Sequence, residues 1–387
     1  MKEYDLTVAL TYYEPYVSGL THTARVIAEG MAERGWRVAV VAARHDRSLP
    51  TRETIAGVDV YRCPVAGVIT RAQVTPTYPL VTARLARRSG VLNLHLPMAE
   101  ASLVARLAGR TPVVSTLHID LYLPPGRLNR VAVAASDITS RSAIRRSAAV
   151  VANSEDQAHA SKFWPLVRER NFRPIPAPCL DRRGGSARYR ETPGLHVGFL
   201  GRIVEDKGIA YLVRAFRRFA DPEARLLIGG NHRTVAGGSN LDDIRGEIAS
   251  DPRIRVLGEL RGAEIDDFYA SIDVFALPSV AESFGIVQAE AMMCGIPSVT
   301  TDLPGGRYPV LATGFGELVP PRDVPALERA LLRQAAIGPG PREASARDAR
   351  QRFSVDTCLD AYEKTFVAAR DAPAIRASLI QRWNRQG

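Results

Sequence analysis

Residues 196–219 read HVGFLGRIVEDKGIAYLVRAFRRF, in which a short apolar run, a turn between two glycines and a segment of helical period follow one another. The run His196–Leu200 is typical of a buried parallel strand, and Ile209–Phe219 is predicted to be the helix after it. This alternation recurs throughout the 387 residues. We therefore predict an α/β protein whose parallel strands are joined by crossover helices.

The length predicts two domains, because single hydrophobic cores stop growing at about 250 to 300 residues. In the first half, strands are predicted at Leu6–Leu10, Arg37–Ala42, Val58–Arg62, Val91–Leu94, Pro112–Thr116 and Ala149–Ala152. The second half is expected to repeat this architecture with strands at His196–Leu200, Ala224–Ile228, Arg253–Val256, Val274–Leu277 and Ser298–Thr301. Each half is predicted to form one doubly wound, Rossmann-like sheet.

Two stretches, Arg173–Pro178 and Asp181–Ser186, are rich in Pro, Gly and charge and lack periodicity, which predicts a linker between the domains. We expect a first domain over residues 1–178 and a second over residues 179–356. After a Pro/Gly-rich break at Gly338–Pro341, helices are predicted at Thr357–Arg370 and Ala374–Arg385. Residues 357–387 are expected to cross back and pack on the first domain.

The composition narrows the classes of protein to consider. The four cysteines are far apart and show no C-x-x-C spacing, so a reducing cytoplasm fits better than a disulfide framework or a zinc site. Neither a secretion signal nor a run of about 18 apolar residues is visible. The net charge of +10 admits solvated helix faces, a membrane surface or an anionic ligand, whereas the lack of interleaved aromatic residues disfavours nucleic acid.

The strongest local motif is AESFGIVQAEAMMCGIPSV at residues 281–299. Ser283 is predicted to cap a helix that runs to about Cys294. The amides of Phe284, Gly285 and Ile286 would then stand at the positive end of this helix. Such an arrangement is suited to binding a phosphate.

Four charged residues accompany this motif. Glu282 precedes the helix and Glu290 lies two turns along it, so the two carboxylates could accept hydroxyl groups from different parts of one ligand. Arg202 and Lys207 follow the first strand of the second half, and two cations in that position would bracket a diphosphate.

These residues also allow less specific interpretations. Both glutamates could be ordinary helix residues, one of them favoured by the helix dipole, and Lys207 could pair with Asp206 or Glu205 at the surface. The glycine-bracketed turn matches neither G-x-G-x-x-G nor a P-loop, which argues against a nicotinamide dehydrogenase and an ATPase.

Taken together, these motifs resemble the donor-binding half of glycosyltransferase family 4, where an E-x7-E motif accompanies basic residues of the same kind. The first half is similar to the family as well. The stretch Tyr12–Leu20 stands where the family has a glycine-rich loop, His118 matches the family's histidine after a first-domain strand, and Val151–Ser154 matches another signature. The resemblance covers nearly the whole chain.

The resemblance implies a GT-B fold, in which two Rossmann-like domains face a central cleft, with the acceptor on the first domain and the donor on the second. The implied activity is the retaining transfer of a hexose-type sugar from a nucleoside diphosphate sugar. UDP is favoured as the nucleotide. A hydroxyl group of a small-molecule or lipid-linked acceptor would receive the sugar, in carbohydrate or natural-product biosynthesis.

The family's site residues map onto this chain by position. Arg202 and Lys207 would hold the diphosphate, Glu282 the sugar hydroxyls and Glu290 the ribose, while His118 would lie beside the reacting sugar. Further donor contacts are implied at Ser18, Gly19, Leu260, Ser283, Phe284, Gly285, Ile286 and Val287. The acceptor is expected to contact Tyr13, His22 and Asp120.

The sequence departs from the family's pattern at two places. Ser18 and Gly19 stand where many members have two glycines, and Ile119 separates His118 from Asp120. No D-x-D motif occurs, so we predict no tightly bound cofactor or metal, and a divalent metal is expected to be at most stimulatory.

Several alternatives stay open. Nucleotide-sugar epimerases and phosphorylases can use the same fold, and a noncatalytic basic module that binds membranes or nucleic acid belongs to a different class. Basic residues beside Leu80, Val81 and Leu85 would permit peripheral contact with the inner membrane surface. The acceptor, the sugar and base of the donor, the linkage position and the oligomeric state are not determined by the sequence.

Overall fold

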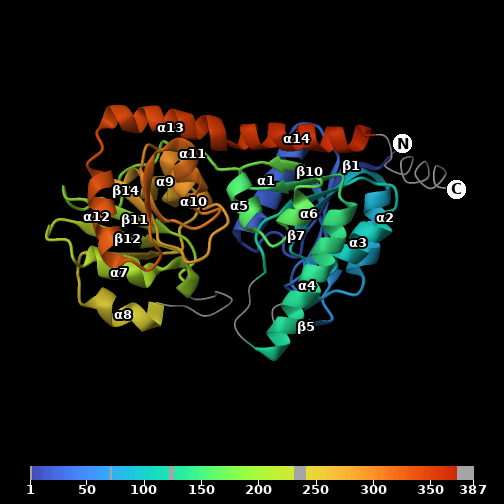
Figure 1. The fold of residues 1–387 in the computed structure, drawn as a ribbon, viewed down its shortest axis with the longest axis horizontal. Helices are drawn as coiled ribbons and strands as arrows, with labels where there is room; N and C mark the ends of the chain where they lie inside the picture. The colour runs from blue at the N-terminus through green and yellow to red at the C-terminus, as the bar shows by residue number, and fades with distance from the viewer. Residues whose placement is uncertain (1, 70–71, 122–125, 231–240, 373–387) are drawn as a thin grey trace. The chain divides into compact units, whose positions relative to one another are not determined.

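The computed structural model describes residues 2–69, 72–121, 126–230 and 241–372. The chain divides into two compact units, the first comprising Met1–Ile175 with Cys358–Gly387 and the second comprising Pro176–Thr357. Each unit has its own sheet flanked by helices (Figure 1). The predicted helix at Ala374–Arg385 lies outside the described residues.

The first unit is built on an eight-stranded sheet that is parallel except at one edge. In spatial order its strands are β10 (Asn171–Pro174), β9 (Ala149–Ala152), β8 (Val113–Leu117), β7 (Ser89–Leu96), β1 (Tyr4–Ala9), β2 (Val38–Arg44), β4 (Val58–Pro64) and β3 (Arg52–Ile55). A small antiparallel pair is formed by β5 (Gly67–Ile69) and β6 (Ala72–Val74). The helices of this unit are α1 (Gly19–Glu33), α2 (Tyr78–Arg87), α3 (Ala101–Leu107), α4 (Arg127–Arg146), α5 (Glu155–Ala160) and α6 (Trp164–Val167).

The second unit contains a six-stranded parallel sheet. Its strands in spatial order are β13 (Ile254–Gly258), β12 (Arg225–Gly229), β11 (His196–Leu200), β14 (Val274–Leu277), β15 (Ser298–Thr301) and β16 (Gly316–Val319). Its helices are η1 (Glu205–Lys207), α7 (Ile209–Phe216), α8 (Leu241–Ala249), α9 (Ala263–Ala270), α10 (Ile286–Met293), α11 (Tyr308–Thr313), α12 (Val324–Ala335) and α13 (Pro339–Phe353). Numbered by their appearance in the chain, the strands have the order 3-2-1-4-5-6, which is that of a Rossmann fold.

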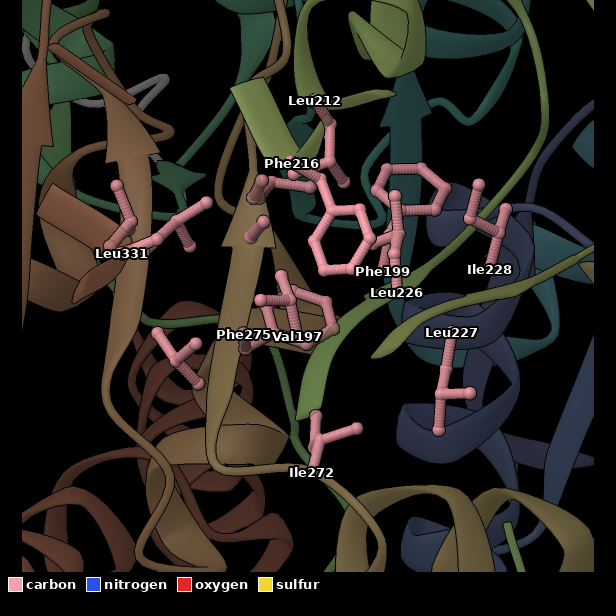
Figure 2. Packing of buried hydrophobic residues seen from close by; sticks show 14 of the residues in the cluster. Val197, Phe199, Leu212, Phe216, Leu226, Leu227, Ile228, Ile272, Phe275 and Leu331 are labelled. Carbon is pink, nitrogen blue, oxygen red and sulfur yellow. The ribbon is translucent and has the colours of Figure 1, made fainter. Parts of the chain in front are cut away.

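The core of the second unit follows from the helical period of α7. Ile209, Leu212, Val213 and Phe216 recur at the spacing of one helix face, and all four are buried. Figure 2 shows Phe216 among side chains of the sheet, with Phe199 of β11 close by. Burying one such side chain stabilises the fold by roughly 1.5 to 3 kcal/mol.

The chain's last described helix, α14 (Val355–Asp371), belongs to the first unit from Cys358 onward. Leu359 lies so close to Gly30 of α1 that a Cβ atom there would come within 2.4 Å of it. The Glu363 carboxylate accepts hydrogen bonds from Arg34 Nη1 at 2.8 Å and from Trp36 Nε1 at 3.1 Å. The predicted return of a C-terminal helix to the first domain is thus confirmed for α14.

Three predictions about local structure were wrong. The predicted linker begins inside β10, an edge strand whose exposed residues lack an apolar pattern and in which Pro174 is tolerated. The break at Gly338–Pro341 is instead the first turn of α13, because Pro339 stands at its first position, where a missing N–H is harmless. Edge strands β3 and β16 were not predicted, since both are half exposed.

Candidate functional site

The order of the strands in the second unit reverses at β11, whose neighbours are β12 on one side and β14 on the other. Ligands of such sheets bind beyond the carboxyl ends of the strands at this switch point. The loops that leave β11 and β14 there are joined by a hydrogen bond from Val280 N to Asp206 O, 2.8 Å long. Gly208 has a φ of +67°, and a Cβ atom on it would lie 2.0 Å from Pro278 O, so glycine is required for this contact.

Lys207 and Glu282 form a mostly buried ion pair across these two loops. Lys207 Nζ lies 2.7 Å from Glu282 Oε2, and their side chains are only 16% and 14% exposed. Burial alone would raise the pKa of Glu282, but the charge and hydrogen bond of Lys207, with the amides of Ser283 and Phe284, bring that pKa below its usual value. Glu282 is therefore ionised at neutral pH. The alternative interpretation, in which Lys207 pairs with Asp206 or Glu205 at the surface, does not hold, because Lys207 pairs with Glu282.

Arg202 lies in the loop that follows β11 and is exposed. Its guanidinium makes no ion pair with any residue that the structure describes. The loop that follows β11 thus carries one partnered cation, Lys207, and one cation that is available to an anionic ligand.

The helix after Glu282 begins later than predicted. Its first residue is Ile286, and the cap position is taken by Gly285 with a φ of +80°, so Ser283 is not the cap. The amide of Ser283 donates to Glu282 Oε1 at 3.0 Å. A Cβ atom on Gly285 would lie 2.4 Å from Gln288 Nε2, so this glycine is required by local packing as well as by its φ. Among the predicted phosphate-binding amides, that of Phe284 is also directed to Glu282.

The second glutamate of the motif, Glu290, is buried on α10 and is 3% exposed. Its Oε1 accepts from Leu180 N at 3.2 Å and lies 3.5 Å from Arg182 Nε, and its Oε2 accepts from Tyr269 OH at 3.2 Å. Burial raises the pKa of Glu290 despite the nearby guanidinium. Oε1 thus faces two donors, whereas Oε2 keeps a second lone pair for a ligand hydroxyl.

Two members of the Glu290 network were missed by sequence reasoning. Arg182 falls in the stretch predicted as a linker, where its charge was the only signal. Tyr269 lies on α9 and had no signal at all, because only the tertiary structure brings it to α10. The predicted base contact, Leu260, is 9% exposed and packs in the core against Gly229 at the end of β12.

In the first unit, the order of the strands reverses at β1, and the stretch Tyr12–Leu20, which stands where the family has a glycine-rich loop, follows this strand. Ser18 caps α1, and its Oγ accepts from Thr21 N at 3.1 Å. A Cβ atom on Gly19 would meet nothing within 4 Å, so the backbone there is accessible. His22 lies half-buried in the first turn of α1.

His118 follows β8 and is 5% exposed. Its Nε2 lies 2.8 Å from His95 Nδ1, and the two ring planes differ by only 20° with centroids 5.0 Å apart, so the rings meet edge to edge through these nitrogens. Burial lowers the pKa of His118 to about 4, so its imidazole is neutral at pH 7. This histidine can therefore exchange hydrogen bonds without carrying a charge.

Two of the predicted acceptor contacts do not match the structure. Tyr13 is fully buried, so its side chain is not accessible to an acceptor. Asp120 is buried as well, and its carboxylate accepts from Ser161 Oγ at 2.7 Å and from Lys162 N at 2.9 Å. Its role is to hold the turn before α6.

Comparison with known proteins connects these two groups of residues to a function. Residues 194–336 match the family model for glycosyl transferases group 1, and residues 18–178 match the model for a glycosyl transferase 4-like domain. The chain is 30% identical over 334 residues to a phosphatidyl-myo-inositol mannosyltransferase of Mycolicibacterium smegmatis, covering 79% of this chain and 78% of the relative. It is 34% identical over 194 residues to a D-inositol 3-phosphate glycosyltransferase of Saccharomonospora viridis, covering 45% and 44%.

Solved structures agree on the fold. Sucrose-phosphate synthase of Thermosynechococcus elongatus is similar with a TM-score of 0.75 at 18% identity, covering 95% of this chain and 100% of that one. The Anabaena protein HepE in complex with UDP-glucose is similar with a TM-score of 0.68 at 19% identity, covering 95% and 100%. The fold is GT-B, and the protein is a glycosyltransferase. More narrowly, the chain belongs to the GT4-type glycosyltransferases, as its motifs predicted.

Two further findings concern metals and membranes. Among the described residues, no group of three or more His, Cys, Asp or Glu side chains could hold a metal ion. Within the same ranges, no helix is both long and apolar enough to cross a membrane.

Proposed function

We propose that this glycosyltransferase moves a hexose-type sugar from a nucleoside diphosphate sugar to a hydroxyl acceptor, with retention of the anomeric configuration. The observation that carries the proposal is the Lys207–Glu282 ion pair beside the exposed Arg202 at the switch point of the second sheet. Cations next to an ionised carboxylate match a ligand that has a diphosphate next to sugar hydroxyls. One solved neighbour, HepE, is described in complex with UDP-glucose, which supports testing UDP-sugars first.

In the proposed reaction, negative charge develops on the diphosphate as it leaves the sugar, and this charge has to be stabilised. The bond between the sugar carbon and the diphosphate oxygen breaks, a new bond forms to the acceptor oxygen on the same face, and the acceptor proton passes to the departing phosphate. Arg202 and Lys207 would stabilise the negative charge that develops on the leaving group. Because these two cations would stabilise the leaving group, we expect turnover without a tightly bound metal.

Glu282 and Glu290 would position the two ends of the donor. Released from Lys207 by the diphosphate, the ionised Glu282 could accept two sugar hydroxyls, and the buried Glu290 could accept from the ribose through the remaining lone pair of its Oε2. Neutral His118 would contact the reacting sugar.

For the acceptor, we propose a hydroxyl of a cyclic polyol, either free or lipid-linked. The names of the relatives, phosphatidyl-myo-inositol mannosyltransferase and D-inositol 3-phosphate glycosyltransferase, support inositol and its phosphates as the first compounds to test.

We also propose that the enzyme acts in the cytoplasm with peripheral contact to the membrane. Leu80 is 66% exposed and lines a hollow of about 270 Å³ with Arg84, Arg87 and Arg88. Val81 is half-buried and Leu85 is in the core, so Leu80 is the exposed one of the three apolar residues beside these arginines.

The donor is tested by thermal unfolding in the presence of UDP, GDP, ADP and their sugars, since a ligand that binds the folded state raises its stability. At a concentration of about 100 times Kd, the stabilisation is about 2.7 kcal/mol. We expect one nucleotide to act, and its effect to disappear in Lys207→Ala and Glu290→Ala. The matched control is Arg218→Ala, which removes the ion pair between the exposed Arg218, in the turn after α7, and Glu328 of α12. No stabilisation by any nucleotide sugar would overturn the proposed donor class, and inversion of the product's anomeric configuration by NMR would overturn retention.

A further inference from the structure

A continuous line of buried hydrogen bonds leads to His118 from the interior of the first sheet. His95 Nε2 lies 2.8 Å from Asn93 Oδ1, and His95 Nδ1 lies 2.8 Å from His118 Nε2. Asn93 is fully buried and His95 is 1% exposed. Both lie on β7 two residues apart, so their side chains share one face of the strand.

The orientation of the Asn93 amide is determined by its other partners. Its Nδ2 donates to the backbone oxygen of Val114 at 3.0 Å and to Thr116 Oγ1 at 2.9 Å. A carbonyl oxygen such as that of Val114 can only accept, so the reversed amide would place two acceptors against each other. The oxygen of Asn93 therefore faces His95.

This orientation determines the protonation of both imidazoles. Because Asn93 Oδ1 can only accept, His95 Nε2 must carry a proton. Burial lowers the pKa of His95 and of His118, so both rings are neutral and each has one proton. His95 Nδ1 is then an acceptor, and the proton between the two rings belongs to His118 Nε2.

We propose that Asn93 and His95 are positioning residues that hold His118 in the Nε2–H tautomer and leave its Nδ1 as a hydrogen-bond acceptor. That nitrogen has no partner among the residues that the structure describes. It would accept a hydroxyl hydrogen of the donor sugar or of the acceptor. This inference rests on the proposed function for the role of His118, but the tautomer itself does not depend on that role.

The hydrogen-bonded series Asn93–His95–His118, here called the relay, also contacts a helix that is distant in the sequence. Thr116 Oγ1 accepts a hydrogen bond from Asn93 Nδ2. The same Oγ1 lies 3.4 Å from the hydroxyl oxygen of Tyr362 on α14. Both groups are buried, so exchange with water does not weaken these bonds.

The tautomer can be measured directly by NMR of protein with ¹⁵N-labelled histidine, because protonated and unprotonated ring nitrogens have well-separated shifts. The chain has seven histidines, and His118→Gln identifies the signals of His118. In the wild-type protein we expect a protonated Nε2 and an unprotonated Nδ1. The opposite assignment would overturn the proposal whatever the activity.

A pair of variants at His95 tests the positioning role. In His95→Asn, the amide oxygen can take the place of His95 Nδ1 as the acceptor for His118 Nε2–H. In His95→Leu, no acceptor is present. We expect His95→Leu to populate both tautomers of His118 and to lower kcat about 10- to 100-fold with a smaller change in KM, and His95→Asn to recover most of kcat. Equal losses of kcat in the two variants, with unchanged melting temperatures, would overturn the positioning role.

The same measurements separate this inference from the proposed function. Full turnover of His118→Gln would overturn the catalytic role of His118 and with it the effect of the relay on turnover. The tautomer measured in the wild-type protein would still decide whether Asn93 and His95 orient that ring.

Discussion

The three charged side chains Arg202, Lys207 and Glu282 differ in how much they contribute to the stability of the fold and how accessible they are to a ligand. Lys207 and Glu282 neutralise each other at 2.7 Å while mostly buried, whereas Arg202 is exposed. A diphosphate would therefore meet Arg202 first and compete with Glu282 for Lys207. Removing Lys207 leaves a buried carboxylate without its charge partner, which affects the fold as well as the reaction.

We predict that the two effects of Lys207 can be separated. Lys207→Met should lower the free energy of unfolding by about 1 to 3 kcal/mol, since the pair is buried but not fully desolvated. Adding Glu282→Gln should recover at least half of this loss, because the unpaired charge is then removed. Turnover should stay more than about 100-fold below wild type in both variants. Urea unfolding and initial rates check this, and substantial turnover in Lys207→Met would contradict the diphosphate assignment.

The buried histidines predict a pH dependence of stability. His118 has a folded pKa of about 4, below the usual value of about 6.5, so the unfolded chain binds a proton in this range and the folded one does not. Its contribution is complete above pH 6.5 and is lost as the pH falls toward 4. Between pH 7 and pH 4.5, wild type should lose about 2 kcal/mol more than His118→Gln. Urea titrations at the two pH values measure these losses. If wild type and His118→Gln lose the same free energy of unfolding between pH 7 and pH 4.5, the burial of a neutral His118 is contradicted.

At the scale of elements, the candidate site depends on how closely the loops beyond β11, β14 and β15 approach one another. Gly208 contacts the loop after β14, and a Cβ atom on Gly306, after β15, would lie 2.8 Å from Glu282 Cβ. Gln288 of α10 donates to Phe284 O at 2.9 Å and to Gly306 O at 2.6 Å. Glycines at these positions let three loops hold the side chains of one cluster.

Two glycine-to-alanine variants test this arrangement. Gly208→Ala places a methyl group against Pro278 O at a positive φ and should destabilise the protein by about 1 to 3 kcal/mol while weakening nucleotide binding. Gly246→Ala is the matched control, because it lies in α8 with nothing within 4 Å of the added carbon. It should be neutral or stabilising by up to about 1 kcal/mol. Similar melting temperatures for the two variants would argue against the close approach of the loops.

At the scale of the whole molecule, the first unit is completed by residues from the far end of the chain. Tyr362 and Phe366 of α14 are buried, and Glu363 bonds to Arg34 and Trp36. Folding of the first unit therefore requires contacts between segments more than 300 residues apart.

A double-mutant cycle measures this long-range packing. Gly30→Ala should destabilise the protein by about 1 to 3 kcal/mol, because the added methyl group overlaps Leu359 Cδ1. Leu359→Ala should cost about 2 to 5 kcal/mol by leaving a cavity. Together they should cost less than the sum, since the methyl group occupies part of that cavity. Additive effects in urea unfolding would show that α1 and α14 do not pack at this point.

Much of the fold could be predicted from local patterns. Strands such as Ala149–Ala152 and Val274–Leu277 were predicted to the residue, because buried parallel strands are continuous apolar runs between turns. Edge strands such as β10 were missed, since their mostly exposed residues carry no such pattern. The glycosyltransferase class was also predicted from short motifs, those at residues 201–208 and 281–299. Each motif lies on a single loop and the helix after it, so the spacing of its residues can be read from the sequence.

The sequence by itself determined the fold class, the family and the residues that can provide charge at the site. Only the tertiary structure decided their partners: Glu282 for Lys207, Arg182 and Tyr269 for Glu290, and the Asn93–His95 pair for His118. It also showed that Tyr13 and Asp120 are buried and that Ser283 does not cap α10. The physical reason is that apolar periodicity and turn chemistry act between neighbours in the chain, whereas burial, ion pairing and tautomer choice depend on residues tens to hundreds of positions away.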